Sequence, residues 1–168
     1  MRLDEILNLQ PLPYKWISPM VGTFEFNDKL FGIVIEPQQF RLPGKVIIMA
    51  NIVFGIVIDI NQPISVDNLD ITITNFGRPR TVMATVAEAC IHNSSLLQFD
   101  MILVGATSEI DKREGVYILA VNEIGRKLPQ YSQTYRITTP MGARIIILSK
   151  MIITPEEESF IGNEYLEK

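Results

Sequence analysis

Residues 75–135 decide the fold, and they read NFGRPRTVMATVAEACIHNSSLLQFDMILVGATSEIDKREGVYILAVNEIGRKLPQYSQTY. A Gly-Arg-Pro-Arg turn opens a helix predicted over residues 81–92. The apolar run 99–105 is typical of a central strand covered on both faces. A second helix is expected over residues 109–127, and a new strand begins near Tyr135. This alternation predicts an α+β domain.

An antiparallel strand meander is predicted ahead of this stretch, and a hairpin is predicted after it. The expected strands are 22–26, 30–36, 45–58 and 69–74, with a turn at 27–29 and loops at 37–44 and 61–68. Gly55 is expected to mark a bulge or bend in the third strand. Residues 135–138 and 143–149 form the closing hairpin. The whole order is meander, then β-α-β-α-β, then hairpin, with helices packed on the sheet and Val86 and Val104 buried.

Composition favours one soluble, folded domain. Of 168 residues, 47% are hydrophobic and 20% are charged, which argues against disorder. Residues 1–155 are predicted to form the domain, and the acidic tail 156–168 is expected to fray. The net charge of −4 provides no global basic field, so we expect no nucleic-acid partner.

The sequence predicts neither export nor membrane insertion. The first sixteen residues carry two acids and no apolar core of signal-peptide length. The longest apolar run, 46–60, is shorter than the roughly 20 residues that a membrane helix needs. The single cysteine, Cys90, cannot form an internal disulfide. We therefore expect a cytoplasmic protein; a phage-encoded chain would lie in the host cytoplasm or in the virion.

The first candidate site is an anion-binding turn at residues 77–81. Gly77 permits a tight turn, and the free N–H groups of the helix that follows could hold a phosphate or carboxylate. Arg78 and Arg80 would supply charge, beside Thr81. The alternative is a solvated loop with two surface arginines, because one glycine does not make a phosphate loop.

Two further pairs of residues invite a chemical interpretation. Arg113 and Tyr117 are four apart and share a helix face, so they could line a pocket beside the turn. The alternative is a packed tyrosine with the arginine stem lying over it. Cys90 and His92 diverge on a helix and cannot pair locally, so Cys90 is interpreted as a core residue. His92 is the only histidine and the carboxylates are scattered, so no metal site is predicted.

The element order resembles that of the GNAT acyltransferase family. In that family, the turn after the fourth strand carries an R/Q-x-x-G-x-G/A signature that binds the pyrophosphate of acetyl-CoA. Here the turn, residues 75–81, lacks the second glycine, and Pro79 removes an N–H donor. The resemblance implies acetyl-CoA as cofactor and Tyr117 as the counterpart of a tyrosine that often serves as general acid.

The chain also resembles small uncharacterised proteins of phages and bacteria over about two-thirds of its length. The shared pattern is a meander, N-x-G-x-x-x-x-V-x-A-T-V, and R-x-x-x-Y about thirty residues later. The matching residues are Asn75, Gly77, Val82, Ala84, Thr85, Val86, Arg113 and Tyr117. This resemblance implies a mobile-element context and no known chemistry.

The sequence thus predicts a non-enzymatic interaction or assembly domain, encoded by a phage or mobile element and without a cofactor. Its partner would be another protein or further copies of itself, because its Ile- and Val-rich strand edges call for a cover. The alternative is an acyl-CoA-dependent N-acyltransferase with a diverged pyrophosphate turn. A nucleic-acid module is the third hypothesis, disfavoured by the acidic charge.

Overall fold

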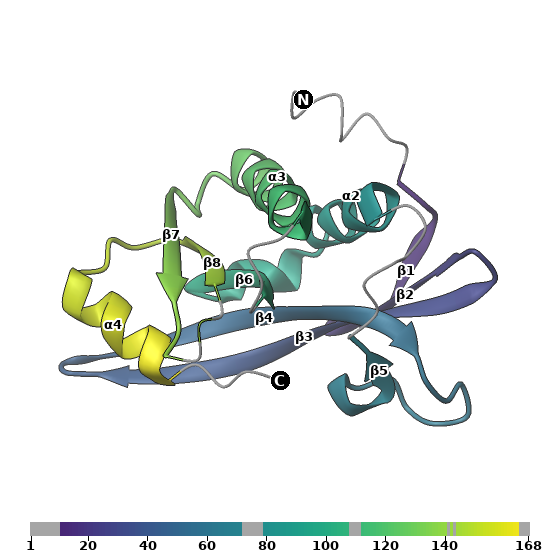
Figure 1. Cartoon of the computed structure of the whole chain (residues 1–168), viewed down its shortest axis with the longest axis horizontal. Helices are drawn as coiled ribbons and strands as arrows, with labels where there is room; N and C mark the ends of the chain where they lie inside the picture. Colours follow the sequence, from purple (N-terminus) through teal and green to yellow (C-terminus); the bar gives the residue numbers. More distant parts are fainter. Residues whose placement is uncertain (1–10, 72–78, 108–111, 141, 143, 165–168) are drawn as a thin grey trace.

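The computed structural model describes residues 11–71, 79–107, 112–140, 142 and 144–164 (Figure 1). The strands are β1 (Tyr14–Ser18), β2 (Val21–Phe26), β3 (Lys29–Leu42), β4 (Lys45–Val57), β5 (Leu69–Asp70), β6 (Met101–Thr107), β7 (Gln133–Thr138) and β8 (Arg144–Ser149). The α-helices are α2 (Pro79–Ile91), α3 (Lys112–Lys127) and α4 (Pro155–Glu164), and the 3₁₀ helices are η1 (Val66–Asn68) and η2 (Ser94–Gln98).

The described strands form one sheet in the order β1-β2-β3-β4-β6-β8-β7, with β5 paired to the end of β4. Only β4 and β6 run parallel, and every other pairing is antiparallel. The predicted α+β class, the antiparallel first half and the closing hairpin are therefore confirmed. The two-residue turn of Asn27 and Asp28 between β2 and β3 has positive φ at both positions, which these residue types tolerate.

The loop predicted at 37–44 is wrong, because β3 continues through Pro37 to Leu42. β2 covers β3 only as far as Ile35, whose N–H donates to the carbonyl of Met20. Hydrogen bonds alternate in direction along a strand, so the missing N–H of Pro37 faces the free edge and costs no pairing. The chain instead turns at Pro43 and Gly44, where Gly44 has a φ of +78°.

Gly55 does not mark a bulge, because the register of β3 and β4 runs unbroken past it. Because Gly55 has no side chain, the neighbouring strand β5 can lie close to β4. A Cβ at Gly55 would lie 2.5 Å from the carbonyl oxygen of Asp70, so β5 could not approach β4 past a larger residue.

Sequence reasoning missed the strand β1, which fastens the meander to α2. The indole N–H of Trp16 donates to the carbonyl of Ala89 over 3.2 Å. Just before the strand, the N–H of Leu12 donates to the hydroxyl of Thr85 over 3.0 Å. These two bonds hold the edge of the sheet against the helix face.

One face of the sheet packs on α2 and α3 around a single continuous core (Figure 1). Side chains alternate between the two faces along a strand, and on β4 this face takes Ala50, Ile52 and Phe54. Val86 of α2 and Val104 of β6 are 0% and 1% exposed, as predicted. Val121, Ile124 and Leu128, expected on one face of the second helix, are buried as well.

The opposite face holds two smaller clusters with separate covers (Figure 1). Ile161 of α4 packs with Ile47 and Ile147 in one cluster, and η1 and β5 cover the other. The tail expected to fray is thus helical to Glu164. Its first turn is a capping box, in which the N–H of Thr154 donates to Glu157 Oε1 over 2.9 Å and the N–H of Glu157 donates back to the Thr154 hydroxyl over 3.2 Å.

Candidate functional site

The predicted anion turn is described only in part. Gly77 and Arg78 lie outside the described residues. The helix α2 begins at Pro79, a position that suits proline. Arg80 follows with an exposed side chain. Thr81 is half-buried, and its carbonyl accepts a hydrogen bond from the Thr85 hydroxyl over 2.8 Å. Of the side chains in this predicted site, Arg80 and Thr81 are described, and Arg80 is the charged one of the two that could bind an anion.

Arg113 and Tyr117 both belong to α3 and keep the four-residue spacing of one helix face. Their side chains lie outside the described part of the structure. α3 follows β6 in the chain, whereas η1 and β5 lie between β4 and α2.

The parallel strands β4 and β6 are paired over a short stretch. β4 and β6 pair from Met49 to Ile52 and from Met101 to Val104. Beyond these residues, β4 pairs with β5 and β6 pairs with β8. The two parallel strands therefore part before they end.

Cys90 and His92 do not meet, as predicted. The Cys90 thiol is fully buried, and burial raises its pKa to about 12. His92 is exposed, and its Nε2 lies 2.9 Å from Glu88 Oε1 one helical turn earlier. Cys90 is a core residue, and no cluster of three or more His, Cys, Asp or Glu side chains in the described part suits a metal ion.

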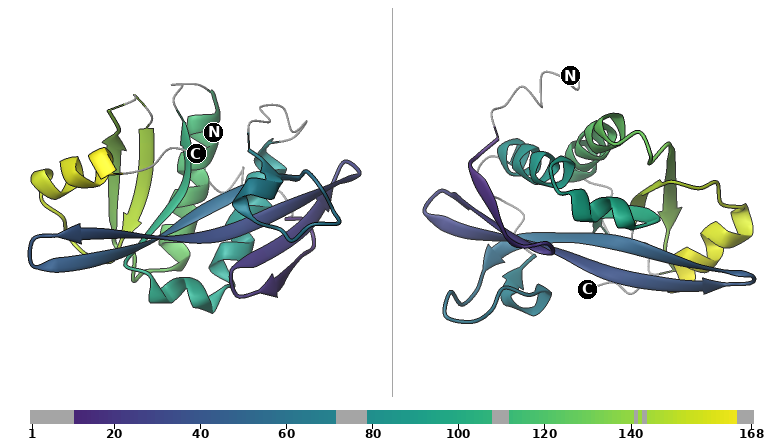
Figure 2. Two further views of the ribbon diagram at one scale, coloured as in Figure 1. Left: turned by 90° about the horizontal axis from the view of Figure 1, so that it is seen from below. Right: turned by 180° about the vertical axis from the view of Figure 1, so that it is seen from behind.

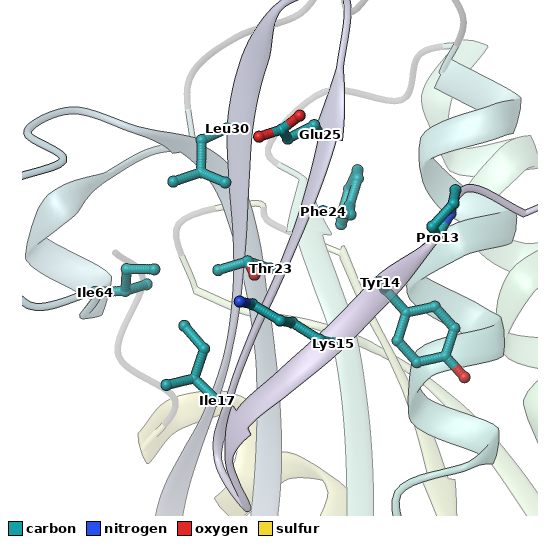
Figure 3. A pocket seen from close by; sticks show the side chains of 9 residues that line it. All are labelled: Pro13, Tyr14, Lys15, Ile17, Thr23, Phe24, Glu25, Leu30 and Ile64. Carbon is teal, nitrogen blue, oxygen red and sulfur yellow. The ribbon is translucent and has the colours of Figure 1, made fainter.

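Two of the hollows on the described surface contain no residue that sequence reasoning had selected. The first, of about 630 Å³, lies along β1 and β2 and is walled by Ile64 (Figure 3). The second, of about 650 Å³, lies between the β3–β4 turn and the first turn of α4. In the second, Lys45 Nζ lies 2.6 Å from Glu157 Oε2 and joins the hairpin to the helix.

The β3–β4 hairpin reaches beyond its neighbouring strands (Figure 2). β2 pairs with β3 only as far as Val34, and β6 pairs with β4 only from Met49. Residues 36–48, here called the arm, therefore have little strand pairing on their outer edges, and on the β4 edge Ile48 hydrogen-bonds to Asp100 through both its N–H and its carbonyl. The arm packs Phe40, Leu42 and Ile47 with α4. Its other face leaves Val46 and Ile48 48% and 41% exposed.

A sequence signal exists for the strand beside the first hollow, but none exists for the arm. The segment Tyr14–Ser18 alternates aromatic residues with Lys15 and Ile17, as a two-sided strand should. Val46 and Ile48 lie in the apolar run 46–60, within the strand predicted over residues 45–58. Local pattern alone does not reveal that the neighbouring strands stop short of them.

Comparison with known proteins supplies no functional assignment, so the function is inferred from this geometry. No protein-family model, curated protein or solved structure matches the chain. Within the described residues, no helix is both long and apolar enough to cross a membrane.

Proposed function

We propose that the chain is a non-enzymatic interaction or assembly domain and that the arm, residues 36–48, is its contact surface. The observation that carries this proposal is the exposed apolar pair Val46 and Ile48 beside strand edges with few partners. Such edges accept an added strand, either from another protein or from a second copy of the chain.

Backbone geometry limits where that strand would pair. Because Ile35 directs its N–H toward β2, the alternating residues Gln39 and Arg41 direct theirs to the open edge. Pro37 lies at the same kind of position and has no N–H. Pairing is therefore expected at the outer half of β3. The proline protects the inner half from indiscriminate strand addition.

Arg41 adds a preference for the partner's charge. It lies opposite Val46 across the hairpin, so its exposed guanidinium and the exposed apolar pair share one face. A partner segment that combines apolar residues with a carboxylate would fit this face, since arginine binds carboxylates in a fixed, forked geometry.

Light scattering after size-exclusion chromatography tests the simplest partner, a second copy. We expect the wild-type chain to run above the mass of one chain at about 100 μM, a concentration chosen to populate micromolar complexes. Val46→Asp should return it to a monomer. The control Ile58→Asp changes another exposed residue outside the arm and should assemble normally. A wild type that stays monomeric, or assembly that survives Val46→Asp, contradicts self-association through the arm.

The biological setting follows from the sequence resemblance and stays a prediction. A phage or mobile-element origin would place the protein in the host cytoplasm or in the virion. An assembly role suits that setting, because such a role needs a self-complementary surface and no catalytic group.

The alternative function is an acyl-CoA-dependent N-acyltransferase. It is favoured by the parting of the parallel strands β4 and β6 and by the exposed Arg80 in the first turn of α2, in an element order similar to that family's. The diverged turn weighs against it, since Pro79 and the absent glycine leave few donors for a pyrophosphate.

A thermal-shift titration with CoA separates the two functions. The interaction domain should show no saturable shift. An enzyme should bind CoA, lose that binding in Arg80→Ala, and acetylate an amine when given acetyl-CoA. Arg126→Ala is the matched control, because Arg126 is exposed near the far end of α3 and pairs with Glu123 over 2.7 Å. Tyr117→Phe would then test the predicted general acid.

A further inference from the structure

The hollow along β1 and β2 lies on the sheet face that α2 and α3 do not cover (Figure 3). Five side chains from this face and one loop shape it; they are Lys15, Ile17, Thr23, Glu25, Leu30 and Ile64. Its volume of about 630 Å³ is in the range of small-molecule sites.

Strand alternation brings the polar groups of the hollow together. Trp16 packs toward α2, so its neighbours Lys15 and Ile17 point to the opposite face. Lys15 pairs in register with Thr23, and their side chains therefore stand next to each other. Figure 3 shows both directed toward the space between Ile17 and Ile64.

The absence of a side chain at Gly32 leaves room for Ile64, which forms the apolar wall of the hollow. Gly32 is the register partner of Thr23, and a Cβ there would lie 2.9 Å from Cγ2 of Ile64. The bare backbone at Gly32 lets the loop after β4 fold over the sheet and place Ile64 opposite Lys15 (Figure 3). A cationic group and an apolar wall thus face each other across a short gap.

Thr23 and Lys15 are the polar groups of this hollow that can bind a ligand. Thr23 lines the hollow and is 6% exposed, and the described part of the chain leaves no buried side-chain N or O atom without a hydrogen-bond partner. Lys15 is exposed and forms no ion pair within the described part of the chain. The Thr23 hydroxyl therefore contributes a polar group to the wall of the hollow, beside the exposed ammonium of Lys15.

We propose that this hollow binds a carboxylate attached to a short aliphatic chain. The Lys15 ammonium and the Thr23 hydroxyl donate to the carboxylate, while Ile17, Leu30 and Ile64 contact the aliphatic chain. Glu25 lies on the same face and repels the carboxylate, so it orients the acid end toward Lys15. This inference does not depend on the function proposed for the arm.

Titration with octanoate, followed by NMR of the backbone amides, tests the proposal. We expect saturable shifts at Lys15, Thr23 and Ile64, with a dissociation constant below about 1 mM, because apolar burial and a charge-assisted bond act together. Octanol and octylamine have the same aliphatic chain without the carboxylate. Both should bind at least about tenfold more weakly.

Two variants distinguish the carboxylate contact from nonspecific apolar binding. Lys15→Gln should weaken octanoate binding about tenfold and leave octanol binding unchanged. Thr23→Val keeps the branched shape and should weaken octanoate about threefold with no loss of thermal stability. Lys29→Gln changes an exposed lysine that does not itself line the hollow; it is the control and should bind as the wild type does.

Three results would overturn the proposal. They are octanoate binding that Lys15→Gln does not weaken, octanol binding as tight as octanoate binding, and no saturable shift at millimolar octanoate. Tighter binding of octylamine would instead assign the polar end of the ligand to Glu25.

Discussion

The two faces of the sheet differ in how they are covered. α2 and α3 lie over one face and share one continuous core with β2, β3, β4, β6 and β8. The other face has two separate clusters, one under the ten-residue helix α4 and one under η1 and β5. The first hollow and the second both involve this less covered face.

Because of this difference, we assign stability mainly to the face under α2 and α3, and binding to the less covered face. A continuous core contributes the burial that holds the fold, since burial stabilises roughly in proportion to apolar area. Small clusters with local covers open more easily, and binding surfaces are drawn from such regions. We therefore expect substitutions on the α2–α3 face to unfold the domain, and substitutions elsewhere to act locally.

Val86→Asp should have the largest effect. It introduces an unpaired carboxylate at a fully buried position of α2, and should cost about 3–5 kcal/mol in the free energy of unfolding measured with urea. Val46→Asp makes the same chemical change at a half-exposed position of the arm and should cost under about 1 kcal/mol. Equal losses in the two variants would show that the arm belongs to the core.

Ile161→Ala should have a smaller and more local effect. The residue is fully buried between α4 and the sheet, and its truncation should cost about 2–4 kcal/mol. Hydrogen exchange should rise in α4 and remain unchanged in α2. The control Ile152→Ala truncates a neighbouring, exposed isoleucine and should change neither. Equal loss of protection in both helices would mean that the two faces unfold as one unit.

Sequence pattern predicted most of the fold because most elements have strong local signals. The helical spacing of Val82, Val86 and Cys90 places them all in the α2 core. The C-terminal helix had a signal as well, a Thr-Pro-Glu-Glu capping box, but its acidic composition favoured a tail. β1 was missed because its alternation extends over only five residues.

The surfaces were harder to predict because they depend on long-range geometry. The arm exists because β2 and β6 end where they do, and no residue within the arm records that. The first hollow needs Ile64 to reach Lys15, almost fifty positions away, across the bare backbone of Gly32. The predicted anion turn had a local signature, but of its side chains only Arg80 and Thr81 lie in the described part.

Cys90→Ala tests the comparison of the two sheet faces in the α2 core. It should lower the free energy of unfolding by about 1–2 kcal/mol, since a small group is lost from that core. In the native wild type, burial holds the thiol pKa near 12, so the thiolate is scarce at neutral pH. Labelling with a thiol reagent at pH 7 should be slow, and urea should accelerate it strongly. Rapid labelling of the folded protein would mean that the covered face opens more readily than we propose.

The smallest effect should come from pH at the joint between the arm and α4. The hydrogen bond from Lys45, followed by that from the Thr154 N–H, lowers the pKa of Glu157 below its ordinary value of 4.5. Because the folded pKa is the lower one, Glu157 stabilises the joint above pH 4.5, and this contribution is lost as the pH falls through the folded value.

The side-chain carboxyl resonance of Glu157, followed by NMR from pH 7 to pH 2, measures this pKa directly. Lys45→Met should raise the pKa toward 4.5, because it removes the main hydrogen-bond donor and keeps the apolar stem. Amide exchange in the first turn of α4 should then increase at neutral pH, while α2 and α3 stay protected. If Lys45→Met leaves the Glu157 pKa unchanged, the ion pair does not join the arm to α4, and the apolar contact of Leu42 with Phe160 must hold them together instead.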